Sequence, residues 1–176
     1  MTTRHLYGFA AALLMMLATA LSASAQVSEE SLDDEDKPSA LLYEFSKDFD
    51  VVFEGVQKGL IDAGYEIDIA SKRKKEVSTK FKILSPGDDD FFDNMEPYGE
   101  IPYVRSPSWK DGRVSLKVLF EETGSGTVMI TVSGELSGYE ERFLRKWLWW
   151  TSNGVLEEAA LQSIVTAVDG AEGSDL

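Results

Sequence analysis

Apolar positions between residues 45 and 63 repeat at intervals of three and four, the spacing that places side chains along one face of a helix. The segment stops at Gly64, which suits a left-handed C-terminal turn. Gly55 and Gly59 lie inside it, where each costs about 1 kcal/mol relative to alanine. The pattern therefore predicts a helix packed closely on a sheet through these glycines; its apolar positions are Phe45, Phe49, Val52, Phe53, Val56, Leu60 and Ala63.

Four later segments alternate between apolar and polar residues, as half-buried strands do. Residues 65–70 and 77–83 flank a basic run and predict one hairpin. Residues 114–120 and 128–132 flank a glycine-rich turn and predict a second.

The C-terminal part of the chain returns to helical spacing. Residues 139–150 predict one helix and residues 156–168 another, and a polar break separates them. Ser152 or Asn153 is placed to cap the second helix.

This order of elements predicts a single α+β domain over residues 40–169. We expect two layers, an antiparallel sheet of about four strands with helices packed on one face. The other face of that sheet would be solvated or would receive a partner. Residues 26–39 are acidic and predict a disordered linker, and residues 170–176 predict a flexible tail.

The first twenty-five residues have the pattern of a secretory signal peptide. Arg4 and His5 form a positive start, residues 6–21 are apolar, and Ala23 to Ala25 supply small residues at a cleavage site. The apolar stretch is short for a membrane span of about 20 residues. We expect cleavage before Gln26 and a periplasmic or secreted protein.

The amino-acid composition limits the kinds of binding and catalysis open to the protein. The chain has 17 Lys and Arg against 31 Asp and Glu, a net charge of −14, which should repel nucleic acid and anionic lipid headgroups. It has no cysteine, and its one histidine lies in the leader, so thiolate and imidazole chemistry is excluded from the processed chain. We therefore expect that the protein is not an enzyme and binds no cofactor. A carboxylate-based hydrolase is a minor hypothesis, with Asp90 and Asp93 as its candidates.

Residues 85–112 predict a long loop. Connections of this length tend to be functional or disordered, and its aromatic residues argue against disorder. The segment either binds a partner or covers the sheet. Asp88 to Glu96 could offer oxygens to calcium, although a solvated acidic turn is the simpler interpretation. The candidate binding residues are Phe91, Phe92, Tyr98, Tyr103 and Trp109.

A second candidate surface interleaves basic residues with Trp147, Trp149 and Trp150. Such segments are typical of helices at a membrane interface. Three tryptophans in four positions cannot all face one core, so some should lie at the surface, ready to contact lipid or protein. Core packing with one small exposed ring is the alternative.

The segment from Leu41 to Val168 resembles the helix-grip domains of the BamC (NlpB) family of outer-membrane assembly proteins. The resemblance depends on the helix ending in Ala63-Gly64-Tyr65, the 114–132 hairpin and the helix from Ser152 to Val168. It implies a non-catalytic scaffold whose partners belong to the outer-membrane assembly machinery. Members of that family carry an acylated cysteine that this chain lacks, so we expect membrane contact to be at most peripheral.

These observations together predict a non-catalytic envelope accessory protein that binds another protein through its aromatic residues. The alternative function is carriage of a lipid or small apolar ligand, because helices gripping a curved sheet can enclose a pocket.

Overall fold

The computed structural model describes residues 40–86, 90–124 and 126–170, which belong to one compact unit. The predicted signal peptide, the acidic linker 26–39 and residues 171–176 of the predicted tail lie outside the described residues. So do Asp88 and Asp89 of the calcium hypothesis.

The centre of the structure is a long antiparallel hairpin. It consists of β6 (Trp109–Thr123) and β7 (Thr127–Glu140), and residues 112–123 pair with residues 127–138 without a register shift. The predicted second hairpin is confirmed, and it extends well beyond the apolar residues that identified it. Polar and glycine positions at its base continue the ladder although they carry no hydrophobic signal.

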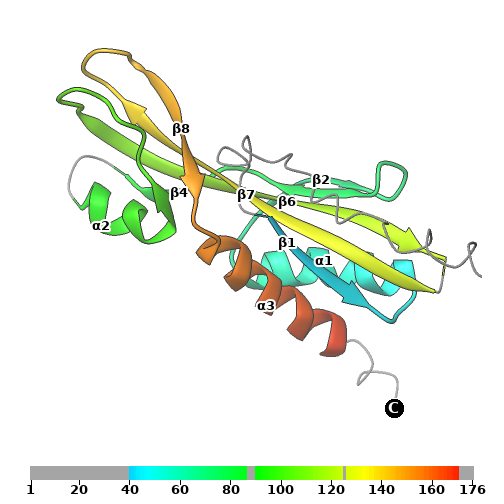
Figure 1. Cartoon of the computed structure of the whole chain (residues 1–176). Coiled ribbons are helices and arrows are strands. Elements are labelled where there is room, and N and C mark those ends of the chain that lie inside the picture. The colour runs from blue at the N-terminus through cyan, green and yellow to red at the C-terminus, as the bar shows by residue number, and fades with distance from the viewer. Residues whose placement is uncertain (1–39, 87–89, 125, 171–176) are drawn as a thin grey trace, which may run out of the picture. The chain divides into compact units, whose positions relative to one another are not determined.

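Six shorter strands line the two edges of this hairpin, so the sheet has eight strands rather than about four (Figure 1). β3 and β4 lie one after the other along β6, and β2 lies outside β3. β1 and β8 lie one after the other along β7, and β5 lies outside β8. The strands are β1 (Ala40–Phe45), β2 (Ile67–Ser71), β3 (Glu76–Thr79), β4 (Lys82–Ser85), β5 (Gly99–Glu100) and β8 (Lys146–Ser152).

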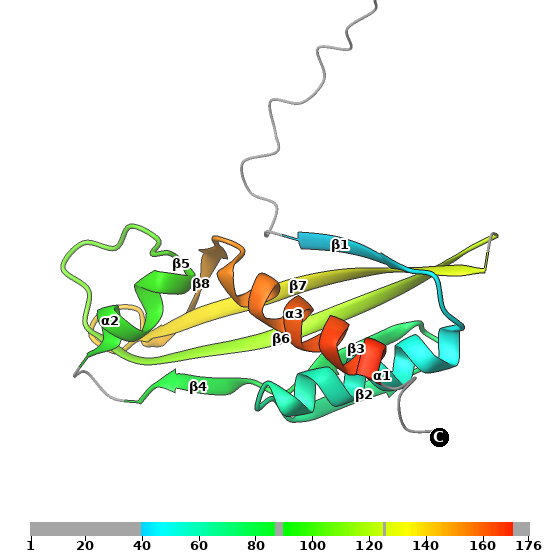
Figure 2. The ribbon, with the colours of Figure 1, turned by 90° about the horizontal axis from the view of Figure 1, so that it is seen from below.

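Two long helices, α1 (Phe49–Asp62) and α3 (Val155–Gly170), lie beside each other on one face of the sheet (Figure 2). The helices predicted for residues 45–63 and 156–168 are thereby confirmed. Gly55 and Gly59 approach α3 rather than the sheet, which corrects the predicted packing. The α+β class and the placement of helices on one face are as predicted; Phe45 belongs to β1, not to the helix.

The helix predicted for residues 139–150 is wrong. Residues 146–152 form β8, which pairs with Leu136 to Glu140 of β7. Trp150 is buried on the helix-covered face, whereas Trp149 is exposed on the opposite face. Because this strand is apolar on both faces, the alternation that identifies a strand is missing from its sequence.

The long loop predicted for residues 85–112 is largely structured. Its residues end β4, form α2 (Phe91–Met95), the 3₁₀ helix η1 (Glu96–Tyr98) and β5, and begin β6. α2 covers a second core cluster at the base of the hairpin, separate from the main core beneath α1 and α3. Sequence analysis considered that this segment either binds a partner or covers the sheet, and α2 covers the sheet.

Candidate functional site on the open face of the sheet

The face of the sheet opposite the helices carries the odd-numbered residues of β6 and β7. Val114, Leu116 and Val118 are buried on the helix-covered face, so the side chains between them lie on the other face. We call it the open face, because the described helices pack on the opposite side (Figures 1 and 2).

Arg113 of β6 is clamped between two aromatic rings on this face. Its guanidinium carbon lies 3.9 Å from the ring centre of Phe81 and 3.8 Å from that of Trp147. Its Nε donates a hydrogen bond of 3.0 Å to the hydroxyl of Ser137. Burial lowers the pKa of the guanidinium, and the charge of Glu135 opposes this only in part. The result is a partly desolvated cation held in a fixed plane.

Further rings extend this arrangement into an aromatic patch, which we define as Phe81, Arg113, Tyr139, Trp147 and Trp149. Tyr139 and Trp147 have ring centres 5.5 Å apart, and Phe81 and Trp149 are 6.3 Å apart. The Trp149 side chain is 59% exposed. A large ring so exposed beside a clamped arginine has the composition typical of binding hot spots.

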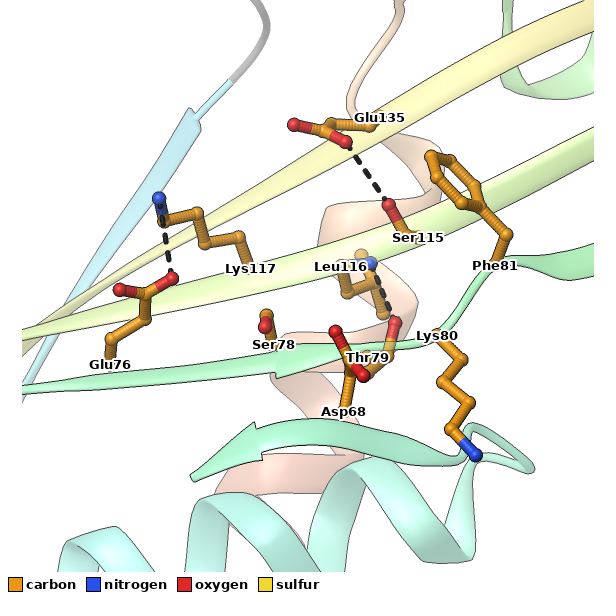
Figure 3. Close-up of a pocket in the computed structure, with 10 residues that line it drawn as sticks. All are labelled: Asp68, Glu76, Ser78, Thr79, Lys80, Phe81, Ser115, Leu116, Lys117 and Glu135. Atoms are coloured by element: carbon orange, nitrogen blue, oxygen red, sulfur yellow. Dashed lines mark hydrogen bonds and ion pairs between the residues drawn. The ribbon is translucent and has the colours of Figure 1, made fainter. Parts of the chain in front are cut away.

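A polar hollow of about 400 Å³ adjoins the patch beside Lys80 and Phe81, the two residues that link β3 to β4 (Figure 3). Within it, Ser115 donates to a Glu135 carboxylate oxygen at 3.3 Å, and Lys117 pairs with Glu76 at 3.4 Å (Figure 3). These walls offer hydrogen-bonding groups of both kinds, which suit a polar group better than an apolar ligand. Its lining residues are Asp68, Glu76, Ser78, Thr79, Lys80, Phe81, Ser115, Leu116, Lys117 and Glu135.

Three of the eight predicted binding residues are core residues instead. Phe91, Trp109 and Trp150 are at most 6% exposed, and their ring centres lie 5.5 to 5.7 Å from one another. Such packing is worth about 0.5–1.5 kcal/mol per pair beyond the apolar area it buries. These three residues were predicted to bind a partner at the surface. They are buried instead, and they stabilise the fold.

The other five separate into two groups. Trp147 and Trp149 lie in the aromatic patch, as the alternation of β8 requires. Phe92 is exposed on α2, Tyr98 packs partly buried against the second core cluster, and Tyr103 is almost fully exposed. Among the described residues, no ring contact joins these three to the patch.

Sequence reasoning missed Arg113, Phe81 and Tyr139. Arg113 lies one residue before the predicted strand 114–120, and Tyr139 was interpreted as the first residue of a helix, so neither was assigned to the open face. The strand that pairs beside them, β8, was not predicted either, because residues 139–150 were interpreted as a helix.

Among the residues that the structure describes, the candidates for catalysis and metal binding do not form a site. Asp90 and Asp93 are exposed at α2. Within the described residues, no group of three or more acidic or histidine side chains is arranged to hold a metal ion. No helix in this part of the chain is both long and apolar enough to cross a membrane.

The buried carboxylate of Glu157 has a structural role. It accepts hydrogen bonds from the backbone N–H of Gly134 at 3.0 Å and from the Ser152 hydroxyl at 2.8 Å, which joins α3 to β7. The side chain of Asn153 accepts a hydrogen bond from the backbone N–H of Val155, and that of Ser152 accepts one from Gly154. Both residues proposed as the cap thus accept backbone N–H groups just before α3, although Gly154 occupies the residue before its first turn.

A comparison with protein-family models finds none that matches the chain, and no curated protein sequence matches it significantly.

Proposed function

We propose that the protein is a non-catalytic accessory protein of the cell envelope, periplasmic or secreted, that binds another protein through the aromatic patch. The observation that carries the proposal is the clamped guanidinium of Arg113 beside the exposed ring of Trp149. Tryptophan, tyrosine and arginine are the residue types on which binding energy most often concentrates.

The geometry of the aromatic patch favours binding, because its side chains lose little conformational freedom when a partner binds. Arg113 is held by two rings and by Ser137, so its rotamers are already restricted before a partner arrives. Immobilising a free side chain at an interface costs about 0.5–1.5 kcal/mol, and this cost falls when the side chain is pre-organised. The four N–H groups on the terminal nitrogens of Arg113 can donate to a partner.

The envelope location follows from the signal peptide predicted for residues 1–25. The resemblance of residues 41–168 to the BamC family implies a scaffold in outer-membrane assembly. We propose a component of that machinery as the partner.

Carriage of a lipid or small apolar ligand is the alternative function, and the hollow on the open face does not favour it. Its walls include Asp68, Lys117 and Glu135, whose desolvation by an apolar ligand would be unfavourable.

Crosslinking in cells of the producing organism, followed by affinity recovery and identification of the captured proteins, tests the proposal. The wild-type protein should recover an outer-membrane assembly component, and Trp149→Ser should reduce that recovery several-fold. Leu42→Ser is the matched control, because Leu42 is an equally exposed apolar residue of the open face at the other end of β7. Equal recovery with Trp149→Ser, or capture of no envelope protein, would count against the function.

A further inference from the structure

Two loops lie next to each other at the end of the sheet where β7 meets β8. One is residues 101–108, which precede β6, and the other is residues 141–145, which join β7 to β8. The backbone N–H of Glu141 donates to the carbonyl oxygen of Ser108 at 3.0 Å. We call these two loops together the β7–β8 tip.

The carboxylate of Glu140 organises this tip from within. Glu140 is fully buried and accepts hydrogen bonds from the backbone N–H groups of Ser108, Arg142, Phe143 and Leu144, at 2.6 to 3.3 Å. One side chain thus holds both loops. A loop whose N–H groups converge on a single buried anion has little conformational freedom left to lose on binding.

The side chains that this backbone presents are apolar and exposed. Phe143 is 61% exposed, Leu144 is 47% exposed, and Tyr103 in the neighbouring loop is 92% exposed. Two consecutive large apolar residues at a turn would ordinarily be placed in a core. Here the hydrogen bonds to Glu140 hold their backbone outside it.

The charge around these residues is opposite in sign to that of the protein as a whole. Residues 101–110 and 140–146 contain two carboxylates, Glu140 and Glu141, and five cations, whereas the whole chain has a net charge of −14. Screening at physiological ionic strength limits the influence of distant charges to about 8 Å, so the local excess governs what approaches the tip. The cations are Arg105, Lys110, Arg142, Arg145 and Lys146.

We propose that the β7–β8 tip is a membrane-docking site that inserts Phe143 and Leu144 into the headgroup region of an anionic bilayer. The five cations would contact lipid phosphates, and Tyr103 would lie at the interface, where aromatic rings with one polar end are favoured. The expectation that net charge repels anionic lipid holds for the remainder of the surface but not for this end. Docking by one rigid tip gives peripheral, reversible attachment, which suits a chain with no cysteine to acylate.

Vesicle co-sedimentation tests this proposal. The secreted protein, recovered after removal of its leader and verified by intact mass, is mixed with vesicles of equal parts phosphatidylglycerol and phosphatidylcholine. Binding should weaken as salt is raised and should be much weaker on phosphatidylcholine alone. Phe143→Ser with Leu144→Ser should lower the partition coefficient by about tenfold. Arg142→Gln with Lys146→Gln should lower it by about fivefold for each charge removed.

Matched controls distinguish specific binding by the tip from nonspecific adsorption to vesicles and from loss of the fold. Leu42→Ser with Ile61→Ser removes two similarly exposed apolar residues elsewhere, and Lys58→Gln with Lys72→Gln removes two distant cations. Both controls should bind vesicles like the wild type, and circular dichroism should show every variant folded. The proposal is overturned if a folded tip variant binds as the wild type does, or if the tip variants lose only a crosslinked protein partner and keep their vesicle binding.

Discussion

Gly59 of α1 lies directly against the backbone of Ile164 in α3. A Cβ built on Gly59 would stand 2.6 Å from Ile164 Cα and 2.8 Å from Ile164 N, closer than real Cβ contacts come. One turn earlier, a Cβ on Gly55 would meet Val168 at 2.4 Å. The two helices therefore approach each other through these glycines.

Gly59→Ala should destabilise the protein although alanine is the better helix former. Overpacking costs about 1–3 kcal/mol and the gain in helix propensity is about 1 kcal/mol, so we expect a net loss of up to about 2 kcal/mol in the free energy of unfolding. Urea denaturation measures it. Gly170→Ala is the control, because nothing lies within 4 Å of its Cβ position, and it should be neutral or stabilising.

Because of Glu140, the free energy of unfolding should decrease at acidic pH. Burial of its carboxyl opposes ionisation, but backbone N–H groups of Leu144, Ser108, Phe143 and Arg142 outweigh that effect and lower the pKa to about 2. Because the folded pKa lies below the usual value of 4.5, the stabilisation is complete above pH 4.5 and is lost as the pH falls toward 2.

Glu140→Gln should therefore lower Tm at neutral pH and flatten the decline of Tm between about pH 4.5 and 2. Thermal unfolding followed over pH checks this. Glu141→Gln removes the adjacent carboxylate and should leave the acid decline in place. An unchanged pH profile for Glu140→Gln would show that the tip is held by other interactions.

The two adjacent tryptophans of β8 should respond oppositely to truncation. Trp150 is buried among Phe91, Trp109 and Leu136, so Trp150→Ala should cost about 3–5 kcal/mol of unfolding free energy. Trp149→Ala should change it by no more than about 0.5 kcal/mol, because its ring is largely in solvent. Chemical denaturation of the two variants measures this difference between the two faces of β8.

Arg113→Lys should disrupt the clamp while keeping the charge. A lysine ammonium cannot lie flat between Phe81 and Trp147, and we expect a loss of about 1 kcal/mol in unfolding free energy with a change in the near-ultraviolet circular dichroism of Trp147. Arg105→Lys, in an exposed loop, should change neither quantity. If the near-ultraviolet spectrum of Arg113→Lys matched the wild type, the stacked geometry would not exist in solution.

Arg145 links stability to the proposed membrane contact. Its backbone φ of 48° lies in the left-handed region, which favours glycine. Arg145→Gly should leave the free energy of unfolding equal or up to about 1 kcal/mol higher, while vesicle binding falls because a cation is lost. Paired denaturation and co-sedimentation measurements would show the two effects separately. A variant that lost stability instead would mean that the arginine side chain, rather than its backbone, supports the turn.

Local periodicity predicted the elements that have one apolar face. These elements are α1, α3 and the centre of the β6–β7 hairpin. Each buries one side and exposes the other, so its apolar residues recur with the period of the helix or strand. β8 was missed because it is apolar on both faces, and α2 was missed because five residues are too few to show a period. The candidate binding residues could not be separated in this way: Trp149 is exposed, whereas Trp150 and Phe91 are buried, and the sequence offered all three alike.

The sequence by itself determined the α+β class, the two long helices, the central hairpin and the acidic character of the chain. Only the tertiary structure decided that the hairpin carries two strands on each edge, that Arg113 lies between Phe81 and Trp147, and that Glu140 holds two loops together. The physical reason is the range of the forces involved. Hydrophobic burial of one face leaves a periodic pattern within a segment, whereas strand pairing, ring stacking on a cation and convergence of N–H groups on a carboxylate join residues distant in the chain and leave none.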